Sequence, residues 1–167
     1  MSSNSGNSSA ANSRLAKQIS TVFGLGSIFP APGTAASAVA LPVAWLIVHL
    51  GSAAWVGRGF LLLAGLIVFA VGAWASELYA RAESRPDPSE CVVDEVAGQW
   101  VACAFAPASL LGFAIAFLLF RAFDISKLWP VNLAERLPGG LGIMLDDIVA
   151  GLMAGAVIAV LAHTGIL

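Results

Sequence analysis

The sequence predicts an all-α fold, a polytopic integral membrane helical bundle with short or re-entrant helices around residues 92–122. Hydrophobic residues make up 59% of the 167 residues, and charged residues make up only 11%. The mean hydropathy is +0.88. Long apolar stretches with few charges are typical of membrane helices, and a proline divides one of these stretches into two short helices.

The first residues differ from the rest in composition. Residues 1–13 are rich in Ser and Asn and contain too few large apolar side chains to bury a core. We therefore predict a disordered tail over residues 1–13 and one membrane-embedded domain over residues 14–167.

Three apolar segments follow along the chain. Residues 35–50 form a short one, and residues 59–79 are long enough to span a bilayer. Residues 150–167 form the third, which we expect the chain to enter directly from Asp146 and Asp147.

The stretch between the second and third segments could be one long span or two short helices. Pro107 breaks a helix, and Ser109 is a good N-cap for a new one. This pair favours a tight helical hairpin, either re-entrant or packed among the other helices.

The basic residues support the hairpin. With a turn at Pro107, the loops 80–95 and 121–145 lie on the same side as the N-terminus. That side then carries Arg14, Lys17, Arg81, Arg85, Arg121, Lys127 and Arg136, and only Arg58 lies opposite. Such an imbalance marks the cytoplasmic face under the positive-inside rule, and the hairpin also gathers the acidic clusters on this face.

Five carboxylates are unusual in so apolar a chain: Asp94, Glu95, Asp124, Asp146 and Asp147. A charge at the bilayer centre costs about 2.5–3.5 kcal/mol on insertion scales. Adjacent acids also repel one another unless a cation or a proton is bound. Helix capping explains one acid well and a pair less well, so we predict that these residues bind a divalent metal at the membrane surface.

Basic and glycine-rich elements accompany the acids. Arg121 and Lys127 flank Asp124 at spacings of three, which predicts either a surface salt-bridge ladder or a phosphate site. Gly33, Thr34 and Ser37 offer backbone N–H groups and hydroxyls that suit a phosphate, although the segment also reads as an ordinary turn. Asp146 and Asp147 diverge by about 100° on a helix, so we expect them to have different roles.

Other classes of function find little support. The net charge is −2, and no basic stripe indicates nucleic-acid binding. The two cysteines lack the spacing of metal ligands, and no Ser/His/Asp or Cys/His set indicates a hydrolase nucleophile.

The joint pattern resembles the phosphatidylglycerophosphatase A family of bacterial membrane lipid phosphatases. The stretches FGLGSIFPAPGTAAS, VVDEVAGQW, FRAFDISKLWP and GGLGIMLDDIVAG carry the resemblance, in order, over residues 23–151. The resemblance implies Mg²⁺-dependent hydrolysis of phosphatidylglycerophosphate to phosphatidylglycerol and inorganic phosphate, in phospholipid biosynthesis. It places the enzyme in the bacterial cytoplasmic (inner) membrane with its active site on the cytoplasmic face.

The resemblance also implies roles for residues. The five acids would be metal ligands or water-activating groups, and Arg121 and Lys127 would bind the phosphate with help from Gly33, Thr34 and Ser37. Attack by water and an aspartyl-phosphate intermediate both stay open, as do the number of metals, the acyl-chain preference and the oligomeric state. The alternative is a small membrane transporter whose acids line a cation or solute path.

Overall fold

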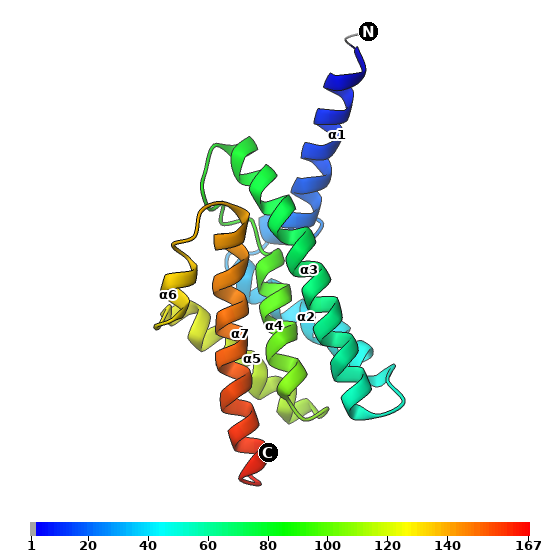
Figure 1. Cartoon of the computed structure of the whole chain (residues 1–167), viewed down its shortest axis with the longest axis vertical. Helices are drawn as coiled ribbons and strands as arrows, with labels where there is room; N and C mark the ends of the chain where they lie inside the picture. Colours follow the sequence, from blue (N-terminus) through cyan, green and yellow to red (C-terminus); the bar gives the residue numbers. More distant parts are fainter. Residues whose placement is uncertain (1–2) are drawn as a thin grey trace.

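The computed structural model describes residues 3–167, with side chains from residue 10 onward, and this range contains helices and no strand. The elements in chain order are α1 (Ser3–Ser20), η1 (Leu25–Ser27), α2 (Pro32–His49), α3 (Ala54–Glu83), α4 (Val93–Phe105), α5 (Leu110–Ser126), α6 (Val131–Ala134) and α7 (Gly140–His163). Figure 1 shows α4 in the middle of the bundle, with α3 and α7 beside it. The predicted all-α class is confirmed.

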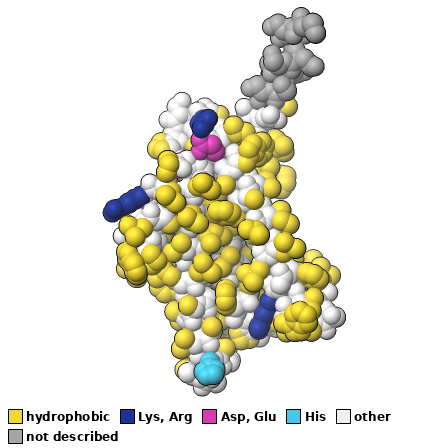
Figure 2. Space-filling model, viewed as in Figure 1, with side chains coloured by type: hydrophobic (Ala, Val, Ile, Leu, Met, Phe, Trp, Pro, Cys, Tyr) yellow, Lys and Arg dark blue, Asp and Glu magenta, His cyan; other side chains and the backbone are white. Residues whose placement is uncertain are grey.

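Three helices of the described range are long and apolar enough to cross a membrane: α2, α3 and α7, with 18, 30 and 24 residues. Their outer surfaces keep large apolar side chains exposed, among them Leu62, Leu66 and Ile67 of α3. Figure 2 shows hydrophobic side chains over most of the face in view, with few charged ones. Contiguous apolar surface of this kind fits contact with lipid, which supports a polytopic membrane bundle.

The predicted break between two short helices is confirmed. α4 has 13 residues and α5 has 17, and Ser109 caps α5 by accepting a hydrogen bond from the Gly112 N–H at 3.0 Å. The Arg58 guanidinium donates to the Ala106 carbonyl at 3.2 Å. The hairpin turn therefore lies at the same end of the bundle as the start of α3.

Glycines set the distance between α4 and α7. A Cβ atom on Gly98 would lie 2.5 Å from the Asp147 carbonyl oxygen and 2.6 Å from Phe120 Cε2. A Cβ atom on Gly151 would in turn collide with the Gly98 carbonyl. Only glycine permits so close an approach of the two backbones, and this approach brings the acidic end of α4 next to that of α7.

The C-terminus of α5 and the first part of α1 complete the fold. α5 ends at Ser126, because Lys127 adopts a left-handed conformation (φ 46°), and Pro130 precedes α6. Residues 3–13 of the Ser/Asn-rich stretch, for which we predict disorder, belong to α1, which projects from the bundle in Figure 1. Residues 10–15 of α1 are exposed, and the boundary between tail and domain stays a prediction.

Candidate active site

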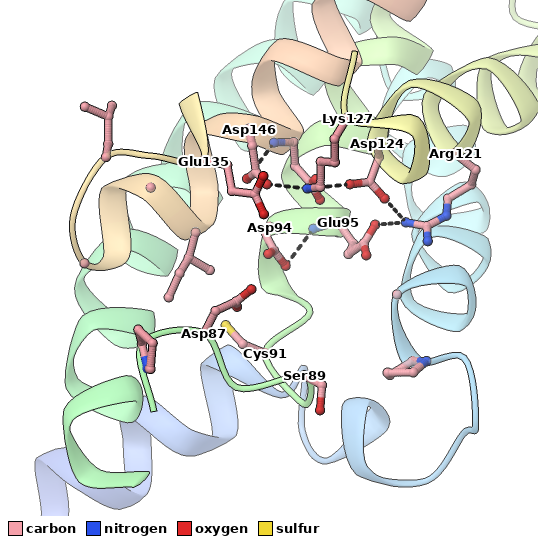
Figure 3. A pocket seen from close by; sticks show the side chains of 18 of the residues that line it. Asp87, Ser89, Cys91, Asp94, Glu95, Arg121, Asp124, Lys127, Glu135 and Asp146 are labelled. Atoms are coloured by element: carbon pink, nitrogen blue, oxygen red, sulfur yellow. Dashed lines mark hydrogen bonds and ion pairs between the residues drawn. The ribbon is translucent and has the colours of Figure 1, made fainter. Parts of the chain in front are cut away.

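A cavity of about 550 Å³ lies at one end of the bundle and collects the acidic clusters. Its walls come from four parts of the chain: the start of α2, the α3–α4 loop with the start of α4, the end of α5, and the segment from α6 into α7. Figure 3 shows the carboxylates of these segments facing one another across the cavity. The structure thus brings together all five of the acids predicted from the sequence.

Helix α4 supplies Asp94 and Glu95 from its first turn, as the sequence predicts. The partial positive charge of a helix N-terminus stabilises carboxylates there. Asp94 Oδ1 accepts a hydrogen bond from the Glu95 N–H at 3.0 Å, and the Asp94 carboxylate makes no ion pair within the described part of the chain.

Helix α5 and its C-cap supply Arg121, Asp124 and Lys127 as a ladder on one face. The Arg121 Nη1 donates to Asp124 Oδ2 at 2.7 Å and also to Glu95 Oε2 of α4. The Lys127 ammonium donates to Asp124 Oδ1 at 3.1 Å. The predicted ladder exists, but it lies in the cavity wall, where the Arg121 side chain is only 13% exposed.

Helix α7 supplies Asp146 and Asp147. The expectation that the helix begins at this pair is wrong: α7 begins at Gly140, and both acids lie in its second turn. Gly140 and Gly142, which precede the two acids, therefore lie in the first turn of the helix, and the backbone packs closely against α3 at Gly140. The two acids differ in their contacts, and their different roles stay a prediction.

Asp146 is paired and Asp147 is not. Asp146 Oδ2 accepts a hydrogen bond from the Lys127 ammonium at 2.5 Å. The Asp147 side chain is 2% exposed, and its Oδ2 is buried with no hydrogen-bond partner. A buried carboxylate oxygen without a partner is costly, so a bound cation would compensate for it.

One group of acids in the described range has the geometry of a cation site. Glu95, Asp124 and Asp147 each offer a carboxylate oxygen, and these oxygens all lie within 4.8 Å of one another. Carboxylate oxygens are the ligands that hard divalent cations prefer. Two basic side chains and seven carboxylates line this cavity, so it also has the negative charge that a divalent cation requires.

Lys127 is held in its charged form. Burial alone lowers the pKa of the ammonium, but its hydrogen bond to Asp146 and the charges of Asp146, Asp124 and Asp147 outweigh this effect and raise the pKa above its ordinary value. The ammonium therefore stays protonated throughout the neutral range.

The glycine-rich start of α2 forms another wall. Gly33 approaches Glu95 so closely that a Cβ atom there would collide with the carboxylate. Thr34 lines the cavity and is exposed. Ser37 is fully buried and its hydroxyl donates to Glu95 Oε2 at 3.2 Å, so it contacts a predicted metal ligand instead of lining the cavity.

Sequence reasoning missed further lining residues, notably Asp87, Ser89, Cys91 and Glu135. The Pro-Asp-Pro sequence around Asp87 is a signal of a fixed turn that could have drawn attention to it. Glu135 has no such signal. Burial raises the pKa of the Cys91 thiol well above its usual range, so the thiol stays protonated and is a poor nucleophile.

The fold and the site define a helical membrane protein whose polar chemistry is concentrated in one acidic cavity with two cations in its wall. A translocation path would instead distribute its acids through the depth of the bundle. This grouping fits a metal and phosphate site better than a transporter.

The family model described as phosphatidylglycerophosphatase A matches residues 18–162, and the chain belongs to this family. The phosphatidylglycerophosphatase A of Escherichia coli is 30% identical over 84% of this chain and 80% of its own length. The protein of the same name from Haemophilus influenzae is 32% identical, covering 81% and 82% of the two chains. A Bacteroides thetaiotaomicron protein, named as a candidate phosphatidylinositol-3-phosphatase, is 34% identical over 85% of this chain and 90% of its own. No solved structure matches the chain.

Proposed function

We propose that this protein hydrolyses phosphatidylglycerophosphate to phosphatidylglycerol and inorganic phosphate, with Mg²⁺ as its cofactor, as a step of phospholipid biosynthesis. The observation that carries the proposal is the buried, unpartnered Oδ2 of Asp147 beside Glu95 and Asp124, in a cavity that Arg121 and Lys127 also line. Membership of the phosphatidylglycerophosphatase A family supports the choice of lipid.

Glu95, Asp124 and Asp147 are the residues that would hold the ion. When bound, Mg²⁺ supplies Lewis-acid polarisation of the phosphoryl group. The remaining groups of the site act on the substrate and on the attacking water.

Arg121 and Lys127 stabilise the negative charge of the phosphate. Both line the cavity, and their carboxylate partners fix them there before substrate arrives. Arg121 Nε has no hydrogen-bond partner in the described residues, so the guanidinium keeps a free donor for a ligand. Fixed donors aimed at developing charge are the main protein contribution to phosphoryl transfer.

Asp94 accepts the proton of the attacking water. Among the five acids, only Asp94 and Asp147 lack a basic partner in the described residues, and Asp147 belongs to the group that would bind the cation. A carboxylate without a basic partner is the better proton acceptor, because pairing with a cation lowers the proton affinity of an acid.

The site faces the cytoplasm in this proposal. The N-terminus of α2, the α3–α4 loop and the start of α7 lie at the end of the bundle that carries most of the basic residues. The positive-inside rule assigns that end to the cytoplasmic side of a bacterial inner membrane.

The test measures phosphate release from phosphatidylglycerophosphate by the purified full chain in detergent micelles, with and without Mg²⁺. We expect Mg²⁺-dependent release from the wild type and a loss of roughly 100-fold or more in Asp147→Asn. Glu83→Gln, which changes an acid outside this cavity, is the control and should stay active.

A second readout is the rise in unfolding temperature on adding Mg²⁺, which reports binding without turnover. The rise should be present in the wild type and absent in Asp147→Asn. A folded wild type that releases no phosphate would refute the assigned reaction. Normal turnover by Asp147→Asn would refute the assigned site.

A further inference from the structure

We propose that Asp87 and Glu135 form a subsite that accepts hydrogen bonds from a hydroxyl group on the carbon next to the phosphorylated carbon of the substrate. The inference rests on the proposed function and specifies the chemistry of the headgroup. The preferred substrates would be lipid phosphate monoesters whose headgroup is a polyol.

Asp87 and Glu135 line the cavity from different walls. Asp87 belongs to the loop between α3 and α4, and Glu135 follows the last residue of α6. Figure 3 shows both carboxylates projecting into the space beside Asp94. The charge of Glu135 acts on Asp87, so the two groups lie within electrostatic range of each other.

Neither carboxylate has a hydrogen bond or an ion pair in the described residues. Lys127, which lines the same cavity, is already bound to Asp124 and Asp146. Arg85, on the same loop as Asp87, pairs with Glu90 instead. The acceptor oxygens of Asp87 and Glu135 are therefore available to a ligand.

The backbone fixes Asp87 in place. It stands between Pro86 and Pro88, and prolines restrict both their own backbone and that of the preceding residue. Pro88 is fully buried, and its carbonyl accepts a hydrogen bond from the Cys91 N–H at 2.8 Å. The prolines restrict the Asp87 backbone while its side chain stays exposed, so a ligand that binds there orders mainly the side chain.

The sign of the charge limits what the pair can bind. Another phosphate group would be repelled by two carboxylates, whereas a neutral hydroxyl can donate a charge-assisted hydrogen bond to either of them. The basic groups that attract phosphate, Arg121 and Lys127, line the same cavity, and the charge of Lys127 also acts on Asp87. A phosphate bound there would leave its neighbouring carbons to face the two acids.

The names of the relatives fit this chemistry. Two are named for phosphatidylglycerophosphate and one for a phosphatidylinositol phosphate. Glycerol and inositol headgroups both carry a hydroxyl on the carbon adjacent to the phosphorylated one. A subsite that recognises this shared feature would suit either headgroup.

The test compares phosphatidylglycerophosphate with its deoxy analogue, in which propane-1,3-diol replaces the headgroup glycerol and no hydroxyl is left. The wild type should prefer the natural lipid by roughly 10- to 100-fold in kcat/KM, the effect of a hydrogen bond to a charged acceptor. In Asp87→Ala and Glu135→Ala this ratio should fall toward one, through a loss with the natural lipid only. Glu83→Ala, outside the cavity, should keep the wild-type ratio.

Phosphonate analogues of the two lipids, which cannot be hydrolysed, give the same comparison through Kd. Hydroxyl-dependent binding that is lost in both variants, in a protein without turnover, would uphold the subsite and refute the proposed reaction. The subsite would be overturned if the wild type showed no preference for the natural lipid, or if the variants lost kcat/KM equally with both lipids. A variant that keeps the wild-type ratio and changes only its Mg²⁺ requirement would overturn it as well.

Discussion

Gly98→Ala tests whether the close approach of α4 and α7 assembles the site. The added Cβ atom would lie 2.5 Å from the Asp147 carbonyl oxygen and 2.6 Å from Phe120 Cε2, where real Cβ atoms stay beyond 3.0 Å. The first of these atoms belongs to the backbone, so the helices themselves must separate, by roughly half an ångström to one ångström.

Such a shift moves Glu95 on α4 away from Asp147 on α7, although neither side chain changes. Metal ligands tolerate displacements of only about 0.2 Å, and a misplacement of about 1 Å in an active site costs roughly 100-fold in rate. We therefore expect phosphate release to fall roughly 100-fold. Overpacking should also lower the free energy of unfolding by about 1–3 kcal/mol, although alanine is intrinsically the better helix former.

The assay pairs initial rates of phosphate release with unfolding temperature in the same detergent. Gly59→Ala is the matched control, because a Cβ atom on Gly59 in α3 meets nothing within 4 Å. It should keep wild-type activity and equal or higher stability. Wild-type turnover and stability in Gly98→Ala would refute the reasoning.

Two further predictions concern groups outside the five acids. Glu77→Ala should lower the free energy of unfolding by about 1 kcal/mol, because the Glu77 carboxylate accepts the Gly140 N–H at 2.6 Å and so caps α7 from α3. Thermal unfolding checks this, with Glu83→Ala on the same helix as control, and equal stabilities of the two variants would contradict it. Cys91 should resist iodoacetamide at pH 7–8 in the folded protein, because its raised pKa leaves almost no thiolate at these pH values. Mass spectrometry measures the labelling, and rapid modification with loss of activity would show that the thiol is ionised or takes part in the reaction.

Local patterns in the sequence determine much of the fold. Length and hydropathy predict the three long apolar helices. Pro107 and Ser109 predict the break between α4 and α5, because a helix breaker and an N-cap act on their own backbone. The spacing of Arg121, Asp124 and Lys127 predicts their ladder for the same reason, since residues three apart are neighbours on any helix.

The start of α7 depends on a contact with another helix, and local sequence does not predict it. Glycines after Pro138 read as a loop, whereas the structure begins the helix at Gly140. The cap that stabilises this start is Glu77, which lies on α3 and is distant in sequence. A helix end that depends on a tertiary partner leaves no local signal of its boundary.

The sequence by itself determined which residues carry the charge, and the tertiary structure decided what each of them meets. The division into paired acids and the unpaired Asp94 and Asp147 depends on how α5 and its C-cap meet α4 and α7. Arg121 pairs with Glu95 of α4, and Lys127 pairs with Asp146 of α7. Asp87 and Glu135 join the cavity for a similar reason, since only the folded chain places the loop after α3 near the end of α6. Composition and spacing act over one or two helical turns, whereas a site is defined by distances between side chains from separate helices, and those distances are set by packing.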